Sequence, residues 1–519
     1  MPPHRHHRHT NPLELEDKII RAAMIGLYMV GSIVVAYWIG KGEQKLLIFL
    51  GLFFAACMTT IGLRHRAWML ILLGWSITGT TAVISVPFSI HDITIMLAAC
   101  SYVAFRVVSP RSDRPSWHIL DAVVGLNLLY LVFTFFHHPV GLRAFGSETI
   151  GARPYVNIGL GLVAYWVIFR LPDSARTASW APFLLLIGVS FVTMLYLISY
   201  VFPSAVSHLS FLYAVSDVGA YFSNRAVEAP IPRFLRFGEF GLTLVFVLCA
   251  YYPPRTLFDL RKVRSYALLL ALSCVLLSGF RNILLKTIMV IVITCFFYRT
   301  WRELAIATLV GGLLVGCLIF GQGRLFDLPL PAQRALAWLP GQWSPTVLAD
   351  VQSSSEGRFQ VWKDVIRYNL IDDWWFGDGF GMTEEDAQTV YSIGSTDEWV
   401  MLTGSYHSGP LTAVRFVGGV GLILFYVLMA AVAYYSVVYV RRCWGTPLQP
   451  LAIYLAVQGI WSPIHYTFVF GGYDSELPQY LLYVGLLRLL IRMTQEMEAT
   501  ARPSAVKAVS PGEVVASAT

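Results

Sequence analysis

Charged side chains are scarce in this sequence: Asp, Glu, Lys and Arg make up 13% of its 519 residues. Soluble domains carry roughly 25%. Hydrophobic residues account for 56% and gather in long stretches. This composition excludes a soluble enzyme, a nucleic-acid-binding protein and a disordered scaffold. A bilayer-spanning helix needs about 20 predominantly apolar residues, so the chain is predicted to be a polytopic membrane protein.

Cysteine pairs with metal-binding spacing are also lacking. The seven cysteines lie mostly inside apolar stretches, without a CxxC motif, and we interpret them as small packing residues. The N-terminal tail, residues 1–18, is rich in histidine and could bind a metal, but a basic tail on the cytoplasmic face is the better interpretation. No small-residue cleavage site follows the first apolar stretch, which is therefore predicted to be a retained span.

Apolar stretches of bilayer length recur along the chain. We predict fourteen membrane helices, at residues 19–39, 46–63, 67–87, 92–108, 118–137, 155–171, 180–200, 237–253, 265–280, 282–298, 303–320, 409–440, 448–468 and 477–494. Eleven of them fall within 19–320 and three within 409–494. The stretch 409–440 is long for one span and is expected to tilt or to project beyond the bilayer.

Loop charges predict the orientation. With the N-terminus inside, every inner connection carries at least two cations, as the positive-inside rule requires. These cations are Arg64, Arg66, Arg106, Arg111, Arg114, Arg170, Arg176, Arg255, Arg261, Lys262, Arg264, Arg299, Arg302, Arg441 and Arg442. The net charge of +7 therefore mostly records orientation and says little about partners. The tail 495–519, whose last part is small and polar, is predicted to be disordered and cytoplasmic.

The segment 321–408 between the two blocks of spans is predicted to lie on the outer side. It carries five cations and twelve acidic residues, and a loop of this length is expected to be structured and functional. Ser353–Ser355 predict the start of a helix that ends near Leu370. Further along, glycines 377, 379 and 381 stand among aromatic residues and predict a turn-rich platform.

Charges beside membrane spans are functional candidates because lipid solvates them poorly. Arg281 lies at a predicted outer boundary, against the positive-inside tendency; the alternative is a snorkelling arginine in a tight turn. Arg358 shares a helix face with Trp362, and two arginines offer multi-donor recognition of phosphate. His407, where the chain re-enters the membrane, can act as a general base, with a structural role as the alternative. Arg415 lies about two turns along the same helix.

Five motifs follow one another between residues 275 and 425. They are Ser278-Gly279-Phe280-Arg281, Arg358-Phe-Gln-Val-Trp362, Trp375-Phe376-Gly377-Asp378-Gly379-Phe380-Gly381, His407, and Phe416-Val417-Gly418-Gly419-Val420-Gly421-Leu422. Their order, spacing and outer location resemble the bacterial O-antigen polymerase and O-antigen ligase superfamily. Two positions differ: Phe280 stands where family members often have Ser or Thr, and Ser408-Gly409-Pro410 where many have an asparagine.

The resemblance implies an all-α, GT-C-like membrane glycosyltransferase with a large, partly helical periplasmic loop; the about 14 transmembrane helices counted from the apolar stretches are about two more than the typical ligase of that superfamily has. It would act at the periplasmic face of the bacterial inner membrane on an undecaprenyl-pyrophosphate-linked glycan. Arg281 and Arg358, joined by Arg415, would bind the pyrophosphate. His407 would accept the proton of the acceptor hydroxyl or orient that hydroxyl. Aromatic stacking on sugar rings would come from Trp362, Trp374 and Trp375, although interfacial girdle residues look the same in sequence.

The reaction so implied needs no cofactor and no metal, because the pyrophosphate linkage supplies the driving force and the arginines stabilise the leaving group. The acceptor would be a lipid-linked repeat unit, as in a polymerase, or lipid A-core, as in a ligase; the extra length and spans favour the polymerase. Membrane lipid and a chain-length regulator are further candidate partners, and nucleic acid is not. A flippase or other transporter is the alternative of another class, but we find no repeat between the halves of the sequence.

Overall fold

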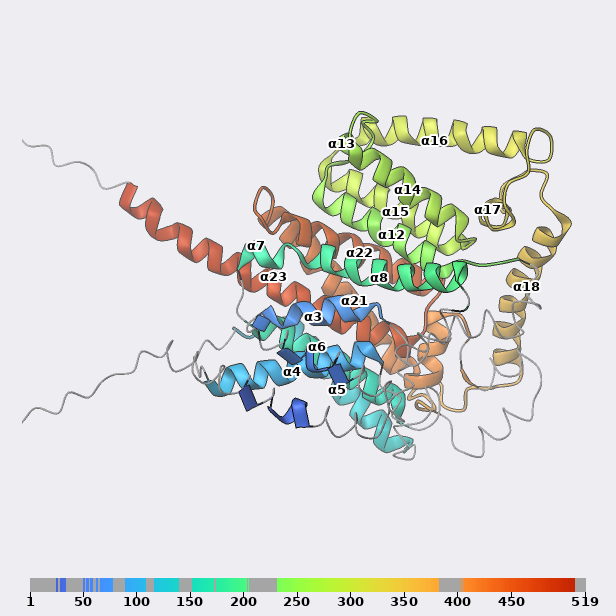
Figure 1. The fold of residues 1–519 in the computed structure, drawn as a ribbon. Coiled ribbons are helices and arrows are strands. Elements are labelled where there is room, and N and C mark those ends of the chain that lie inside the picture. The colour runs from blue at the N-terminus through green and yellow to red at the C-terminus, as the bar shows by residue number, and fades with distance from the viewer. Residues whose placement is uncertain are drawn as a thin grey trace, which may run out of the picture.

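The computed structural model describes residues 66–77, 89–108, 116–139, 152–171, 174–202, 231–381 and 406–508, with a few short stretches elsewhere. All named elements in these parts are helices (Figure 1). The tail 1–18, most of the predicted spans 19–39 and 46–63, and the acidic residues 384–386 lie outside the described residues.

The predicted spans that fall within the described residues are helices, most of them with closely similar bounds; of the span 67–87, only 68–75 is a helix, and residues 78–87 lie outside the described residues. They are α3 (Trp68–Trp75), α4 (Ile90–Val108), α5 (Ile119–His137), α6 (Arg153–Arg170), α8 (Ala181–Val201), α12 (Leu235–Tyr251), α14 (Val263–Leu277), α15 (Arg281–Tyr298), α16 (Trp301–Gly321), α21 (Gly409–Arg442), α22 (Gln449–Phe468) and α23 (Tyr473–Ala508). Two short helices, α7 (Ala175–Ala178) and α13 (Pro254–Leu257), precede α8 and α14. Among the residues that the structure describes, six helical stretches are long and apolar enough to cross a membrane, so the protein is a polytopic membrane protein. The total of fourteen spans stays a prediction.

The C-terminal helices form the centre of the bundle. α23 packs along α6 and α21, and α21 packs along α22 (Figure 1). Glycines allow the close approach: a Cβ at Gly485 would lie 3.0 Å from the Tyr165 Cα. Arg488 on α23 also ties this helix to α5 through Asp121, with 2.8 Å between Nε and Oδ1. In contrast, α16 lies at the edge of the bundle, where Gly321 is its one buried residue.

α23 differs from its prediction. It continues to Ala508, beyond the predicted span end at 494 and into the segment predicted to be a disordered tail. Hydrogen bonds and charge stabilise the extension: Arg492 pairs with Glu496 at 3.7 Å, and the Thr500 hydroxyl donates to the Glu496 carbonyl. The first residues of this tail are therefore helical, and 509–519 lie outside the described residues.

The segment after α16 contains two helices, α17 (Leu330–Leu336) and α18 (Pro345–Arg367). α18 confirms the predicted helix, but the predicted start at Ser353–Ser355 was wrong. The helix begins at Pro345, because proline is favoured in the first helical turn. Val361 and Val365 on α18 are buried against Ile371 and Tyr406, which gives this segment an apolar cluster of its own.

α21 is broken at Gly418, whose backbone has φ 65° and ψ −178°. Only glycine adopts such angles readily. The loop after α18 fills the break with main-chain hydrogen bonds. Gly419 N donates to Trp374 O at 2.8 Å, Val420 N to Trp375 O at 3.2 Å, and Asp378 N to Arg415 O at 2.8 Å. Broken backbone at membrane depth requires such partners, so these bonds tie the loop to the helix.

This joint between residues 374–379 and α21 leaves no room for side chains at its glycines. A Cβ on Gly418 would lie 2.1 Å from the Trp375 carbonyl oxygen, and one on Gly377 would lie 2.4 Å from the Gly418 nitrogen. Arg415 adds an ion pair with Asp378. Below the loop, Phe380 stacks on Phe416 at 4.9 Å. The predicted aromatic, turn-rich platform is thus a loop bound to the break in α21.

Candidate functional site

Arg281 is the first residue of α15, after a sharp turn from α14. Gly279 makes the turn with φ 77°. The Ser278 hydroxyl donates to the Val275 carbonyl at 2.7 Å and accepts from Phe280 N at 3.3 Å. This local network holds the half-exposed Arg281 side chain at the end of the helix pair. The Phe280 position, where relatives were expected to have a hydroxyl, contributes an apolar side chain next to the arginine.

A buried carboxylate, Asp350, links this turn to the following segment. Its Oδ2 lies 2.6 Å from Arg334 Nε, and its Oδ1 lies 2.8 Å from a guanidinium nitrogen of Arg233. Arg334 also donates to the Gly279 carbonyl at 2.5 Å. A chain of contacts thus runs from α18 through Arg334 to the backbone just before Arg281.

The pKa of Asp350 is lowered. Burial by itself would raise it, but hydrogen bonds and charge from Arg334 and Arg233 outweigh burial. The carboxylate therefore stays ionised at neutral pH. Its contribution to stability is present above the unfolded pKa of about 3.9 and is lost as the pH falls through the lower folded value.

Arg281 and Arg358 line one cavity of about 840 Å³. Arg233, Arg334 and Glu239 also line it, and Glu239 already pairs with Arg236 at 2.8 Å. Within the described residues, no carboxylate lies within ion-pair distance of Arg358. Four guanidinium groups and one acid line the cavity, and Asp350 pairs with two of the four arginines, so the lining keeps a net positive charge, as a phosphate-binding site requires.

The rest of the lining is mostly apolar. It consists of Phe280, Leu284, Leu285, Ile288, Trp338, Phe468, Val469 and Phe470, with Leu235, Asn282 and Ser354. Leu285 and Ile288, on the candidate membrane span α15, are 43% and 45% exposed, and Phe468 at the end of α22 is 80% exposed. The cavity is therefore lined by both guanidinium groups and apolar side chains, some of which are exposed on the helix surface.

His407 lies beside this cavity. Its ring stacks on Phe470, a lining residue, with 5.4 Å between centroids. Its backbone has φ 54°, an uncommon conformation for a side chain other than glycine. Nδ1 is buried without a hydrogen-bond partner among the residues that the structure describes. Burial and, to a smaller extent, the charge of Arg358 lower the pKa of His407, so its imidazole is neutral at neutral pH and can accept a proton.

Trp362 connects the segments that carry Arg358 and His407. Its indole Nε1 donates to the Tyr406 carbonyl at 2.8 Å, which joins α18, carrying Arg358, to the residue before His407. Trp362 was predicted to stack on sugars, and the structure gives it this bridging contact. Trp374 and Trp375, 40% and 68% exposed, lie at the joint on α21. None of the three tryptophans lines the cavity.

Arg415 is also placed apart from the cavity. It was predicted to help bind pyrophosphate, but it pairs with Asp378 and is not among the lining residues. The sequence reasoning missed Arg233 and Arg334 as candidates. Their signal was present, since both are arginines in predicted outer segments, yet only the fold brings them to Arg281.

A family model described as O-Antigen ligase matches residues 266–426. Over these residues the chain is similar to the O-Antigen ligase family. No curated protein matches the chain. The matched segment runs from α14 to the middle of α21 and includes Arg281, Arg358 and His407. Members of this O-Antigen ligase family are membrane enzymes of the ligase or polymerase type, which transfer lipid-linked glycans. Arg233 and Phe470, which complete the cavity, lie outside the matched segment.

Proposed function

We propose that this protein is a polysaccharide polymerase of the bacterial inner membrane, acting at the periplasmic face. It transfers an undecaprenyl-pyrophosphate-linked glycan onto a sugar hydroxyl of another lipid-linked glycan. The observation that carries the proposal is the single cavity that joins Arg281 and Arg358, next to neutral His407. A lipid pyrophosphate needs both kinds of lining residue, cations for the phosphates and apolar side chains for the lipid.

The proposed reaction forms one bond and breaks one. The acceptor hydroxyl oxygen attacks the anomeric carbon of the donor glycan, and the bond from that carbon to the pyrophosphate oxygen breaks. His407 accepts the hydroxyl proton, or orients the hydroxyl. Negative charge grows on the leaving lipid pyrophosphate, where Arg281 and Arg358 are already in place to stabilise it.

Arg334 and Arg233 have a different part in this proposal. Asp350 neutralises them in part and holds them beside the turn that carries Arg281. We assign them to positioning, with Arg334 acting on the Gly279 carbonyl. Trp374 and Trp375 remain candidates for sugar contacts because their rings are exposed next to the loop joint.

The deciding experiment incubates the purified full-length protein with lipid-linked repeat units, with and without lipid A-core, and sizes the products. A ladder of chains formed without lipid A-core is the expected result. Transfer onto lipid A-core alone assigns the ligase reaction instead. No product with either acceptor contradicts glycan transfer and supports a flippase or transporter.

Two controls sharpen this assay. Arg358→Ala is compared with Arg367→Ala, a change on the same helix at a side chain that lies beside Tyr368 and outside the cavity. Only the first is expected to remove the products. Addition of a chelator tests the proposed metal independence: an unchanged ladder agrees with it, and loss of the ladder contradicts it.

A further inference from the structure

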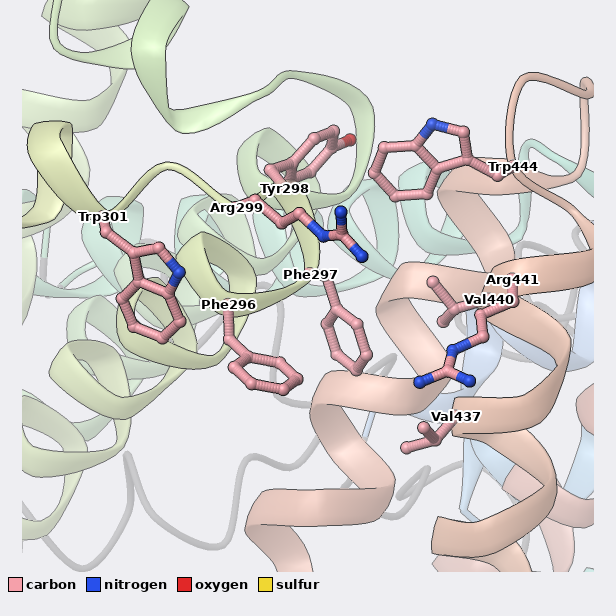
Figure 2. A pocket seen from close by; sticks show the side chains of 9 residues that line it. All are labelled: Phe296, Phe297, Tyr298, Arg299, Trp301, Val437, Val440, Arg441 and Trp444. Carbon is pink, nitrogen blue, oxygen red and sulfur yellow. The ribbon is translucent and has the colours of Figure 1, made fainter.

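A second basic pocket lies at the opposite end of α15 from Arg281. It has a volume of about 620 Å³ and is lined by residues from the end of α15, the start of α16 and the end of α21 (Figure 2). α15 has 18 residues, which separates its two ends by about 27 Å. The pocket therefore lies near the other face of the membrane, the one that the loop charges predict to be cytoplasmic.

Two arginines from different helices point into this pocket, Arg299 and Arg441 (Figure 2). In the described parts of the chain neither forms an ion pair with a carboxylate. Glu303, on the first turn of α16, does not line the pocket. The site therefore has a net positive charge and suits an anion.

The backbone at Arg299 is unusual for a charged side chain. α15 ends there with φ 55° and ψ 38°, and Thr300 N donates to the Cys295 carbonyl at 3.0 Å. This is the helix end at which glycine is normally found, and a larger residue costs about 1 kcal/mol in this conformation. An arginine kept at a glycine position, aimed into a pocket, indicates that its side chain has a use there.

Aromatic side chains form the walls. Phe296 meets Trp301 edge-on at 5.8 Å, and Tyr298 meets Trp444 at 5.2 Å. Phe296 and Trp301 are 57% and 53% exposed, so this wall is open at the side. Tryptophan at the level of lipid headgroups is typical of membrane interfaces.

An apolar track leads away from the arginines. A neighbouring cavity of about 580 Å³ shares Val437 and Arg441 with the pocket, is also lined by Arg442, and continues along α21 past Ala433 and Tyr434. Basic pockets between membrane helices on the cytoplasmic side suit lipid phosphates. A soluble anion would gain nothing from the apolar track, whereas an acyl chain would cover it.

We infer that this pocket binds the phosphate of an anionic phospholipid of the cytoplasmic leaflet between Arg299 and Arg441, with an acyl chain along α21. The occupant is separate from the glycan donor, which belongs to the cavity at the other end of α15. Lipid bound here joins the ends of α15, α16 and α21; Arg281 begins α15, and His407 lies two residues before α21.

The test is native mass spectrometry of the full-length protein in detergent, titrated with phosphatidylglycerol, phosphatidylcholine or inorganic phosphate. Wild-type protein is expected to bind one phosphatidylglycerol at least about tenfold more tightly than phosphatidylcholine. The double variant Arg299→Asn/Arg441→Gln should lose this preference. Asparagine is chosen because it tolerates the left-handed backbone. Arg302→Gln removes a neighbouring arginine outside the pocket and should bind like wild type.

Three results would overturn the inference: equal binding by the double variant, equal binding of phosphatidylcholine, or displacement of phosphatidylglycerol by millimolar inorganic phosphate. Each single variant is titrated too, so that an unfolded double variant leaves two decisive measurements. Glycan transfer is not part of the readout, and a failure of the proposed function would leave this result unchanged.

Discussion

The segment between α16 and α21 meets the membrane helices at two places that are built in opposite ways. At the cavity, side-chain charges make the contact: Asp350 holds Arg334, and Arg334 holds the turn before Arg281. At the joint on α21, main-chain hydrogen bonds make it, around glycines 377 and 418. The first place depends on which functional groups are present, and the second on side chains being absent. Substitutions should therefore affect activity at the first place and folding at the second.

The largest effect on activity is expected from Arg281→Ala and Arg358→Ala. Each should lower glycan transfer at least about 100-fold, because a preorganised cation at the leaving group is lost. The yield and thermal stability of the protein should not change. Product sizing checks the first statement and a melting curve the second. Arg324→Ala, at a loop arginine that lies over Phe320, is the control; full activity in both cavity variants would remove them from the site.

The largest effect on folding is expected from Gly418→Ala. Its Cβ would lie 2.1 Å from the Trp375 carbonyl, and the backbone angles there suit glycine alone, so the cost should exceed about 3 kcal/mol. Gly419→Ala is a matched control one residue away, with its nearest neighbour at 3.5 Å. Folded yield and melting temperature are the measurements. Equal stability of the two variants would mean that the joint is not rigid.

Asp350→Asn should lower both activity and folding stability moderately. It leaves two arginines without their carboxylate, at a cost of about 1–3 kcal/mol, and it loosens the turn that places Arg281. We expect activity to fall about tenfold. Asp364→Asn is the control: this buried carboxylate on the same helix accepts from Gln360 at 2.9 Å and does not line the cavity. A purely structural role predicts loss of stability with unchanged turnover per folded molecule.

The pH dependence should follow His407. Its folded pKa lies below the ordinary value of about 6.5. Activity should therefore be constant near neutral pH and fall only on the acid side, below about pH 6.5. Folding stability should also fall on the acid side. As the pH falls below about 6.5, the unfolded chain is protonated at this histidine before the folded protein is, which favours unfolding. A pH–rate profile checks this, and His407→Ala should lack the acid limb; a limb retained in that variant assigns it to another group.

The smallest effect is expected from Trp375→Ala. Its ring is 68% exposed and outside the cavity, so the loss of one stacking contact should raise the KM for acceptor about twofold to tenfold and leave kcat unchanged. Trp117→Ala, at a similarly exposed tryptophan before α5, should have no effect. A fall in kcat instead would indicate that Trp375 acts through the joint on α21.

Hydrophobic stretches predicted the helices well because lipid demands long apolar segments and leaves few alternatives. Arg281 and Arg358 could be predicted as functional candidates for a related reason, because charged residues next to apolar spans are rare and easily recognised in the sequence. Arg415 stood out equally, yet it is paired with Asp378. Helix ends were less predictable. The hydroxyl residues Ser353–Ser355 predicted a start of α18 that is later than the observed start at Pro345. An ion pair within α23 stabilises a C-terminal extension that the composition of that segment did not predict.

The sequence by itself determined that this is a helical membrane protein and which cations are functional candidates, because hydropathy and charge are properties of each residue. Only the tertiary structure decided which of those cations meet. Arg233, Arg334 and Asp350 join Arg281 from distant parts of the chain, and Phe470 brings His407 to the same cavity. The same holds for the break in α21, where glycine was visible but its hydrogen-bond partners were not. Such contacts depend on how whole helices pack, and no local pattern encodes that.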